Sequence, residues 1–194
     1  AMFKKGKRMK KYSKLFIIIL LFIIIVISSK YWYQNLSNDY SVNPISDGSL
    51  EAEENDVRDF VVVDENGEER TLQSFIGKPI VLNFWASWCP PCKAELPDFQ
   101  DAYEKYGTQV EFVMVNLTDG VRETEDVAKD YMNTNGYTLP VYFDINQDAV
   151  NAYSIYSIPT TYFINKDGEM VTSVKGMINS ETLEEEIKMM MQDA

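Results

Sequence analysis

Histidine is absent from this 194-residue chain, and cysteine occurs only twice, at positions 89 and 92. Structural zinc sites usually take four Cys or His ligands, so one molecule cannot complete the common set. Covalent attachment of c-type haem requires Cys-x-x-Cys-His, but Lys93 stands where that histidine would be. Two uses of the cysteines therefore stay open, a short structural disulfide and a reactive dithiol pair.

Acidic residues are absent from residues 1–30, which hold eight of the 18 Lys and Arg side chains. The rest of the chain carries ten basic and thirty acidic side chains, which gives it a net charge of −20. Nucleic-acid binding depends on Lys and Arg meeting phosphates. Such an acidic body therefore argues against a nucleic-acid partner.

Long apolar runs are also absent, apart from the thirteen residues 15–27 that follow the basic start. A helix of this length spans about 20 Å, less than the roughly 30 Å of a bilayer core. The segment is typical of a signal peptide or of an N-terminal membrane anchor. We favour the anchor, because no Ala-x-Ala-like cleavage site follows and Tyr31-Trp32-Tyr33 is placed as an interfacial aromatic belt. Both alternatives put the remaining chain outside the cytoplasm, by the positive-inside rule.

The sequence predicts three parts. Residues 1–30 are the basic region and membrane anchor, or signal peptide, and residues 56–194 form one folded domain. Between them, residues 31–55 are polar and acidic, with Asn-Pro and Asp-Gly pairs. This composition favours a flexible tether.

Within the domain, apolar runs and turn signals predict alternating strands and helices. The strands are expected at 59–63, 68–72, 80–85, 110–116, 139–143, 160–164 and 170–174. The helices are expected at 91–106, 124–133 and 148–153, with a last helix capped by Ser180. This order of elements predicts an α/β fold.

Cys89 and Cys92 lie where the apolar strand 80–85 gives way to the helix 91–106. A helix N-terminus stabilises negative charge through its free N–H groups and its dipole. Thiols in such positions have lowered pKa values, and the thiolate is their reactive form. A second thiol one turn further can resolve a mixed disulfide. A purely structural disulfide remains the alternative, although so short a loop would stabilise the fold weakly.

Two distant segments resemble the thioredoxin fold, and within it the extracytoplasmic TlpA/ResA-like thiol-disulfide oxidoreductases. One segment, residues 79–97, contains Cys-Pro-Pro-Cys, and the other, residues 156–168, is followed by Gly176. Cys-x-x-Cys alone is weak evidence, but the two segments in this order are specific. The resemblance covers about residues 56–191. It implies a thioredoxin-like α/β fold with an N-terminal β-hairpin and a central helix–strand insertion within residues 118–143.

The resemblance also implies roles for individual residues. Cys89 would be the attacking thiol at the exposed start of the helix, and Cys92 the more buried resolving thiol. Pro159 would be a cis-proline that faces the disulfide and leaves the Ile158 backbone free to pair with an extended substrate. Pro91 would influence the reduction potential. Substrate contacts are expected from the residues around the pair, namely Trp88, Pro90, Pro91 and Ile158.

The chain departs from thioredoxin on the strand before the cysteines, where Asn83 replaces a buried aspartate. Glu95, three positions after Cys92, matches an acidic residue of the TlpA/ResA-like proteins and could supply acid–base catalysis. The alternative is a solvated glutamate on the helix surface. No Pro-x-x-x-Thr-x-x-Cys stretch occurs, which argues against a peroxiredoxin.

The sequence thus predicts a membrane-tethered extracytoplasmic thiol-disulfide reductase whose redox group is the Cys89–Cys92 pair, with no metal and no other cofactor. The resemblance implies a transmembrane electron donor of the CcdA/DsbD type. It also implies disulfide-containing protein substrates, such as apocytochrome c or methionine sulfoxide reductase. The alternatives are a disulfide-introducing oxidase, a docking domain without catalysis and, for location, a secreted protein.

Overall fold

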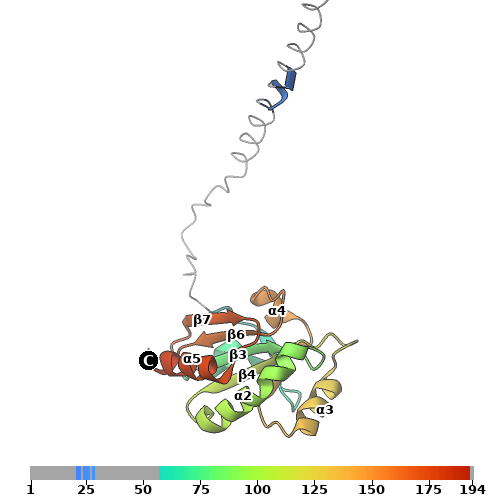
Figure 1. The fold of residues 1–194 in the computed structure, drawn as a ribbon. Helices are drawn as coiled ribbons and strands as arrows, with labels where there is room; N and C mark the ends of the chain where they lie inside the picture. The colour runs from blue at the N-terminus through green and yellow to red at the C-terminus, as the bar shows by residue number, and fades with distance from the viewer. Residues whose placement is uncertain (1–20, 23, 27, 29–56, 193–194) are drawn as a thin grey trace, which may run out of the picture. The chain divides into compact units, whose positions relative to one another are not determined.

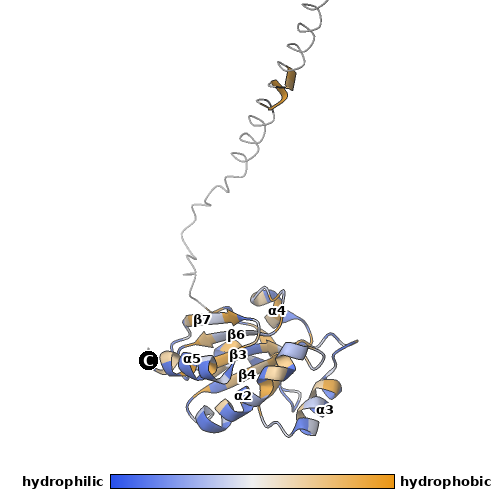
Figure 2. Ribbon diagram, in the orientation of Figure 1, coloured by the Kyte–Doolittle hydropathy of each residue, from blue (hydrophilic) through white to orange (hydrophobic). Residues whose placement is uncertain are grey.

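The computed structural model describes residues 21–22, 24–26, 28 and 57–192. The chain divides into two units, residues 1–50 and 51–194. In the first unit the described residues are helical, and their ribbon has the colour of hydrophobic residues in Figure 2 (orange). Their large apolar side chains are exposed. No helix within the described residues is both long and apolar enough to cross a membrane. Most of the predicted anchor, and all of the predicted tether at 31–55, lie outside the described residues.

Residues 57–192 are built on a mixed sheet with the strand order β2-β1-β5-β4-β3-β6-β7. Figure 1 labels β4, β3, β6 and β7 of this sheet. Strands β3, β4 and β5 are parallel, whereas β1–β2 and β6–β7 form antiparallel pairs at the two ends. The strands are β1 (Val61–Val63), β2 (Glu69–Thr71), β3 (Ile80–Trp85), β4 (Glu111–Asn116), β5 (Val141–Phe143), β6 (Thr160–Ile164) and β7 (Met170–Lys175).

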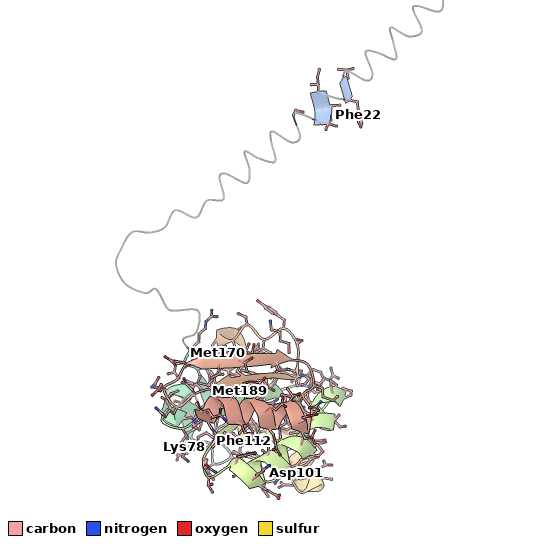
Figure 3. The ribbon with its side chains drawn as sticks, turned by 60° about the vertical axis from the view of Figure 1, so that its left-hand side comes forward. Phe22, Lys78, Asp101, Phe112, Met170 and Met189 are labelled. Atoms are coloured by element: carbon pink, nitrogen blue, oxygen red, sulfur yellow. A yellow bond between two sulfur atoms is a disulfide. The ribbon has the colours of Figure 1, made fainter. Side chains whose placement is uncertain are left out.

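Helices cover both faces of this sheet. They are the 3-10 helix η1 (Leu72–Phe75) and the α-helices α2 (Pro90–Tyr106), α3 (Glu125–Asn135), α4 (Asp148–Ala152) and α5 (Ser180–Gln192). One apolar cluster joins α2, α3 and α5 to the sheet, and a second joins η1 and α4 to its other face. Phe112 of β4 lies in the first cluster, while Lys78 and Asp101 lie at the surface (Figure 3).

Strand β3 leads directly to the cysteines and is buried at every position. Its residues alternate between the faces, since Val81 and Trp85 join the cluster under α2 while Leu82 and Phe84 join the opposite cluster. A strand with helices on both faces needs apolar side chains throughout. Asn83 is the one polar residue in this strand, and it faces α2.

The predicted α/β fold is confirmed, with its N-terminal hairpin β1–β2 and its inserted α3 and β5. Strands β3 and β6 have the predicted bounds, and the other predicted elements differ by one or two residues at their ends. The strand expected at 68–72 ends at Thr71, because the Thr71 side chain caps η1 by accepting the Ser74 N–H.

The predicted cap of the last helix is wrong by one residue. Ser180 is the first residue of α5, and the cap is Asn179. Its Oδ1 accepts the Thr182 N–H at 2.9 Å, and its carbonyl oxygen accepts the Leu183 N–H at 2.9 Å.

Replacing Asn179 by alanine should lower the free energy of unfolding by about 1 kcal/mol, the usual cost of losing a cap. Ser180→Ala is the matched control and should cost much less, because alanine is a good residue within the first turn. Urea unfolding of both variants measures the difference. A larger loss for Ser180→Ala than for Asn179→Ala would instead identify Ser180 as the cap.

Candidate active site

The cysteine pair forms the first turn of α2. Cys89 is the cap residue, with extended backbone angles (φ −89°, ψ 109°), and its Sγ accepts the Cys92 N–H at 3.3 Å. Pro90 and Pro91 occupy the next positions, where a fixed φ suits a helix start and the missing N–H is no loss. The two sulfurs form a disulfide, with the Cα atoms 5.3 Å apart. A reduced Cys89 in this position has its negative charge favoured by an N–H group and by the helix dipole.

Both cysteines are buried in this disulfide form, with 2% of Cys89 and 0% of Cys92 exposed. The expectation of an exposed Cys89 is therefore wrong for the oxidised pair. Cys89 packs into the apolar cluster under α2, and its Sγ lies 3.7 Å from the carbonyl oxygen of Ile158. The exposed neighbours of the pair in the sequence are Trp88, Pro90, Pro91 and Lys93.

Ile158 and Pro159 immediately precede β6, the strand next to β3, and the Ile158 carbonyl oxygen reaches the disulfide. The Ile158–Pro159 bond is cis, as expected, and Pro159 is buried immediately before β6. Strand β6 runs antiparallel to β3, which brings together two segments 69 positions apart in the sequence. The roles of Pro159 and Ile158 toward a substrate remain predictions.

Glu95 is buried beneath the first turns of α2, with 2% of its surface exposed. Its Oε1 accepts from Asn83 Nδ2, and its Oε2 accepts from the Ile178 N–H, both at 3.0 Å. Burial raises the pKa of Glu95 to about 7, despite the lowering effect of these two hydrogen bonds, and the charge of Asp98 raises it further. The alternative of a solvated surface glutamate is therefore wrong. A carboxyl group with this pKa can take or give a proton near neutral pH.

Asn83 connects Glu95 to strand β6. Its Nδ2 also donates to Thr161 Oγ1 at 3.0 Å, while its Oδ1 has no hydrogen-bond partner within residues 57–192. Rotation of the amide by 180° would turn Oδ1 toward Glu95. Asn83 can thus donate to the carboxylate or accept from the protonated acid.

Sequence interpretation missed two residues that contact the turn before Cys89. Glu123 is fully buried and accepts from Ser87 N at 2.8 Å and from Ser87 Oγ at 2.6 Å. Arg122 lies over the indole of Trp88, with 3.9 Å from its Cζ to the ring centre. The only sequence signal was a short polar segment after a buried strand, which is equally typical of a solvated loop.

A cavity of about 160 Å³ lies beside Trp88, between the loop that follows β4 and the start of α4. Trp88 forms one wall, and the others come from Leu117, Thr118, Asp119, Asp144, Gln147 and Val150. Within the described residues, no group of three or more Cys, Asp or Glu side chains could hold a metal ion. The redox group of the site is the Cys89–Cys92 disulfide.

A disulfide that caps a helix after the central strand, with a cis-proline opposite, is the arrangement of the thioredoxin-fold disulfide oxidoreductases. Residues 54–173 match the AhpC/TSA family, and the chain belongs to that family.

Relatives and solved structures agree with this class. The thiol-disulfide oxidoreductase ResA of Geobacillus kaustophilus is 34% identical over 131 residues, which is 67% of this chain and 73% of the relative. ResA of Bacillus subtilis is 37% identical over 133 residues, which is 68% of this chain and 69% of the relative. The crystal structure of StoA from Bacillus subtilis aligns with a TM-score of 0.58 and 33% identity, over 66% of this chain and 96% of StoA. The chain is a ResA-like thiol-disulfide oxidoreductase.

Proposed function

We propose that this oxidoreductase is a membrane-tethered reductase of disulfides in proteins outside the cytoplasm. The observation that carries the proposed chemistry is the position of Cys89 at the start of α2, where its Sγ accepts a hydrogen bond from the Cys92 N–H. Support for the tether comes from the basic start and the apolar run at 15–27. A secreted protein released by signal cleavage is the alternative.

The exchange has two steps. The Cys89 thiolate attacks one sulfur of a substrate disulfide, so a Cys89–substrate bond forms and the other substrate sulfur leaves as a thiolate that takes a proton. Cys92, as a thiolate, then attacks the Cys89 sulfur, which closes the Cys89–Cys92 disulfide and releases the second substrate sulfur. The substrate gains two electrons and the protein loses two.

Glu95 is the proposed acceptor of the proton that Cys92 must lose. It lies three residues after Cys92 on α2 and is buried on the same side of the helix as Cys92. Its pKa of about 7 allows it to accept this proton at neutral pH and release it after the exchange.

The proposed substrate site surrounds the buried pair. The exposed Trp88, Pro90 and Pro91 form its rim, and the backbone of Ile158 lies beside Cys89. An extended substrate segment would pair with the Ile158 backbone by adding a short strand. Proposed substrates are disulfide-containing proteins such as apocytochrome c or methionine sulfoxide reductase, and the proposed electron source is a transmembrane donor of the CcdA/DsbD type.

The reduction potential separates this proposal from a disulfide-introducing oxidase. We expect a value nearer to thioredoxin's, about −270 mV, than to DsbA's, about −120 mV. We also expect the dithiol form in cells, and its oxidation when the transmembrane donor is deleted. Equilibration with glutathione buffers gives the potential, and thiol trapping in cells gives the redox state.

A potential above about −150 mV, together with oxidised protein in wild-type cells, would identify an oxidase. A docking domain without catalysis would exchange no faster than its Cys89→Ser variant with a small disulfide. That comparison therefore tests whether the domain is catalytic before the direction of transfer is considered.

A further inference from the structure

The residues just before Cys89 form a tight turn. The Cys89 N–H donates to the Ala86 carbonyl oxygen at 3.1 Å, which leaves Ser87 and Trp88 as the central residues of the turn. This turn joins the end of β3 to the start of α2. Its shape therefore decides where the Cys89 sulfur and the Trp88 indole lie.

Glu123 binds the first of these central residues. Its Oε1 accepts from Ser87 N and from Asn116 Nδ2, at 2.8 and 2.7 Å, and its Oε2 accepts from Ser87 Oγ at 2.6 Å. Burying a carboxyl group without hydrogen-bond donors is costly. Here Glu123 is fully buried, and both of its oxygens have donors. Asn116 is itself held, because its Oδ1 accepts from Thr118 Oγ1 at 2.9 Å.

Arg122 covers the second central residue, Trp88, with its guanidinium over the indole ring. Such stacking combines a cation–π attraction with apolar contact. The carboxylate of Asp119 sets the backbone of this loop, since its Oδ1 accepts the N–H groups of Val121, Arg122 and Glu123 at 2.7 to 2.9 Å. Two consecutive loop residues therefore hold the two central residues of the turn.

We propose that Arg122 and Glu123 form a clamp that positions the Ala86–Cys89 turn for disulfide exchange. Both are positioning residues, which act through Trp88 and Ser87. The proposal rests on the proposed function of Cys89 as the attacking thiol, and it makes the loop between β4 and α3 a working part of the site.

The two halves of the clamp have different consequences. Glu123 sets the backbone before Cys89, so its loss should lower kcat by misplacing the sulfur. Arg122 holds Trp88, one wall of the 160 Å³ cavity, so its loss should act mainly on substrate binding and raise KM.

The test uses the full chain and reduction of a disulfide peptide. We expect Glu123→Ala to lower kcat by about 10- to 100-fold, the scale of a small misplacement of a reacting group. Glu123→Gln should recover most of this loss, because the glutamine oxygen can still accept from Ser87 N and Asn116, while its NH₂ donates to Ser87 Oγ. Arg122→Ala should raise KM several-fold, with kcat within about twofold. Glu125→Ala, two residues along, is the control, since Glu125 pairs with Lys129 on α3.

Two further measurements separate positioning from loss of folding. In the reduced protein, the pH profile of Cys89 alkylation should shift in Glu123→Ala and return in Glu123→Gln. Ser87→Ala combined with Glu123→Ala should cost little more than Glu123→Ala alone, because the Ser87 Oγ hydrogen bond is already lost in Glu123→Ala. If Glu123→Ala does not fold, the milder Ser87→Ala variant tests the clamp in its place. Ser87→Ala should slow disulfide exchange about threefold or more.

Wild-type kinetics and an unshifted alkylation profile in the folded Glu123→Ala or Ser87→Ala variants would overturn the clamp. A loss that Glu123→Gln does not restore would also overturn it. An inactive wild-type protein would instead contradict the proposed function, so the two failures are distinguishable.

Discussion

Replacing Cys92 by serine should convert the protein into a trap that stays disulfide-bonded to its substrates through Cys89. The first attack remains available, because Cys89 keeps its place at the start of α2, but no thiol is left to resolve the mixed disulfide. Turnover should be lost completely. Non-reducing electrophoresis and mass spectrometry of cell extracts would show the adducts and the cysteine that carries them.

Cys89→Ser is the matched control, and it should lose both turnover and trapping. Serine is a preferred cap residue, so the start of α2 should survive this replacement and inactivity would not reflect unfolding. In the reduced wild-type protein, brief iodoacetamide treatment should label Cys89 first. Adducts formed on Cys92, or preferential labelling of Cys92, would make Cys92 the attacking thiol and Cys89 the resolving thiol.

Replacing Glu95 by glutamine should stabilise the folded protein at pH 8 by on the order of 3 kcal/mol, while slowing disulfide exchange. The folded state holds the proton of Glu95 up to about pH 7, whereas the unfolded chain releases it near pH 4.5. Stability therefore falls as the pH rises through this interval, and the full loss is present above pH 7. Glutamine has no charge to bury and should escape this loss.

Urea unfolding of the disulfide form from pH 5 to pH 8 measures the effect, and the gap between Glu95→Gln and wild type should widen with pH. The control is Asp101→Asn, an exposed acid on the same helix, which should follow the wild-type curve. Parallel curves for all three proteins would contradict the raised pKa. If Glu95→Gln exchanged disulfides at the wild-type rate from pH 5 to pH 9, Glu95 would have no role in proton transfer.

The elements could be predicted because local patterns specify them. Strand β3 reads as an apolar run because helices cover both of its faces, and the prolines and cysteines mark the start of α2. The burial of Glu95 could also have been predicted from the sequence. The spacing of one helix face is shared by Cys92, Glu95, Leu96 and Phe99.

Other features depend on tertiary contacts that local patterns do not contain. Glu123 and Ser87 are 36 positions apart, and only the packing of β4 beside β3 brings them together. Asn179 and Ser180 are equally good caps by residue type, so the choice between them rests on which side chain meets the Thr182 N–H. The burial of Cys89 likewise depends on the distant Ile158.

The two prolines after Cys89 have a consequence for hydration. A helix start normally offers four unpaired N–H groups to water or anions. Here Pro90 and Pro91 have none, the Cys89 N–H donates to Ala86, and the Cys92 N–H donates to the Cys89 sulfur. No donor of this helix end is left for solvent, so an approaching apolar segment displaces few ordered waters. Covering this helix end therefore carries little dehydration cost.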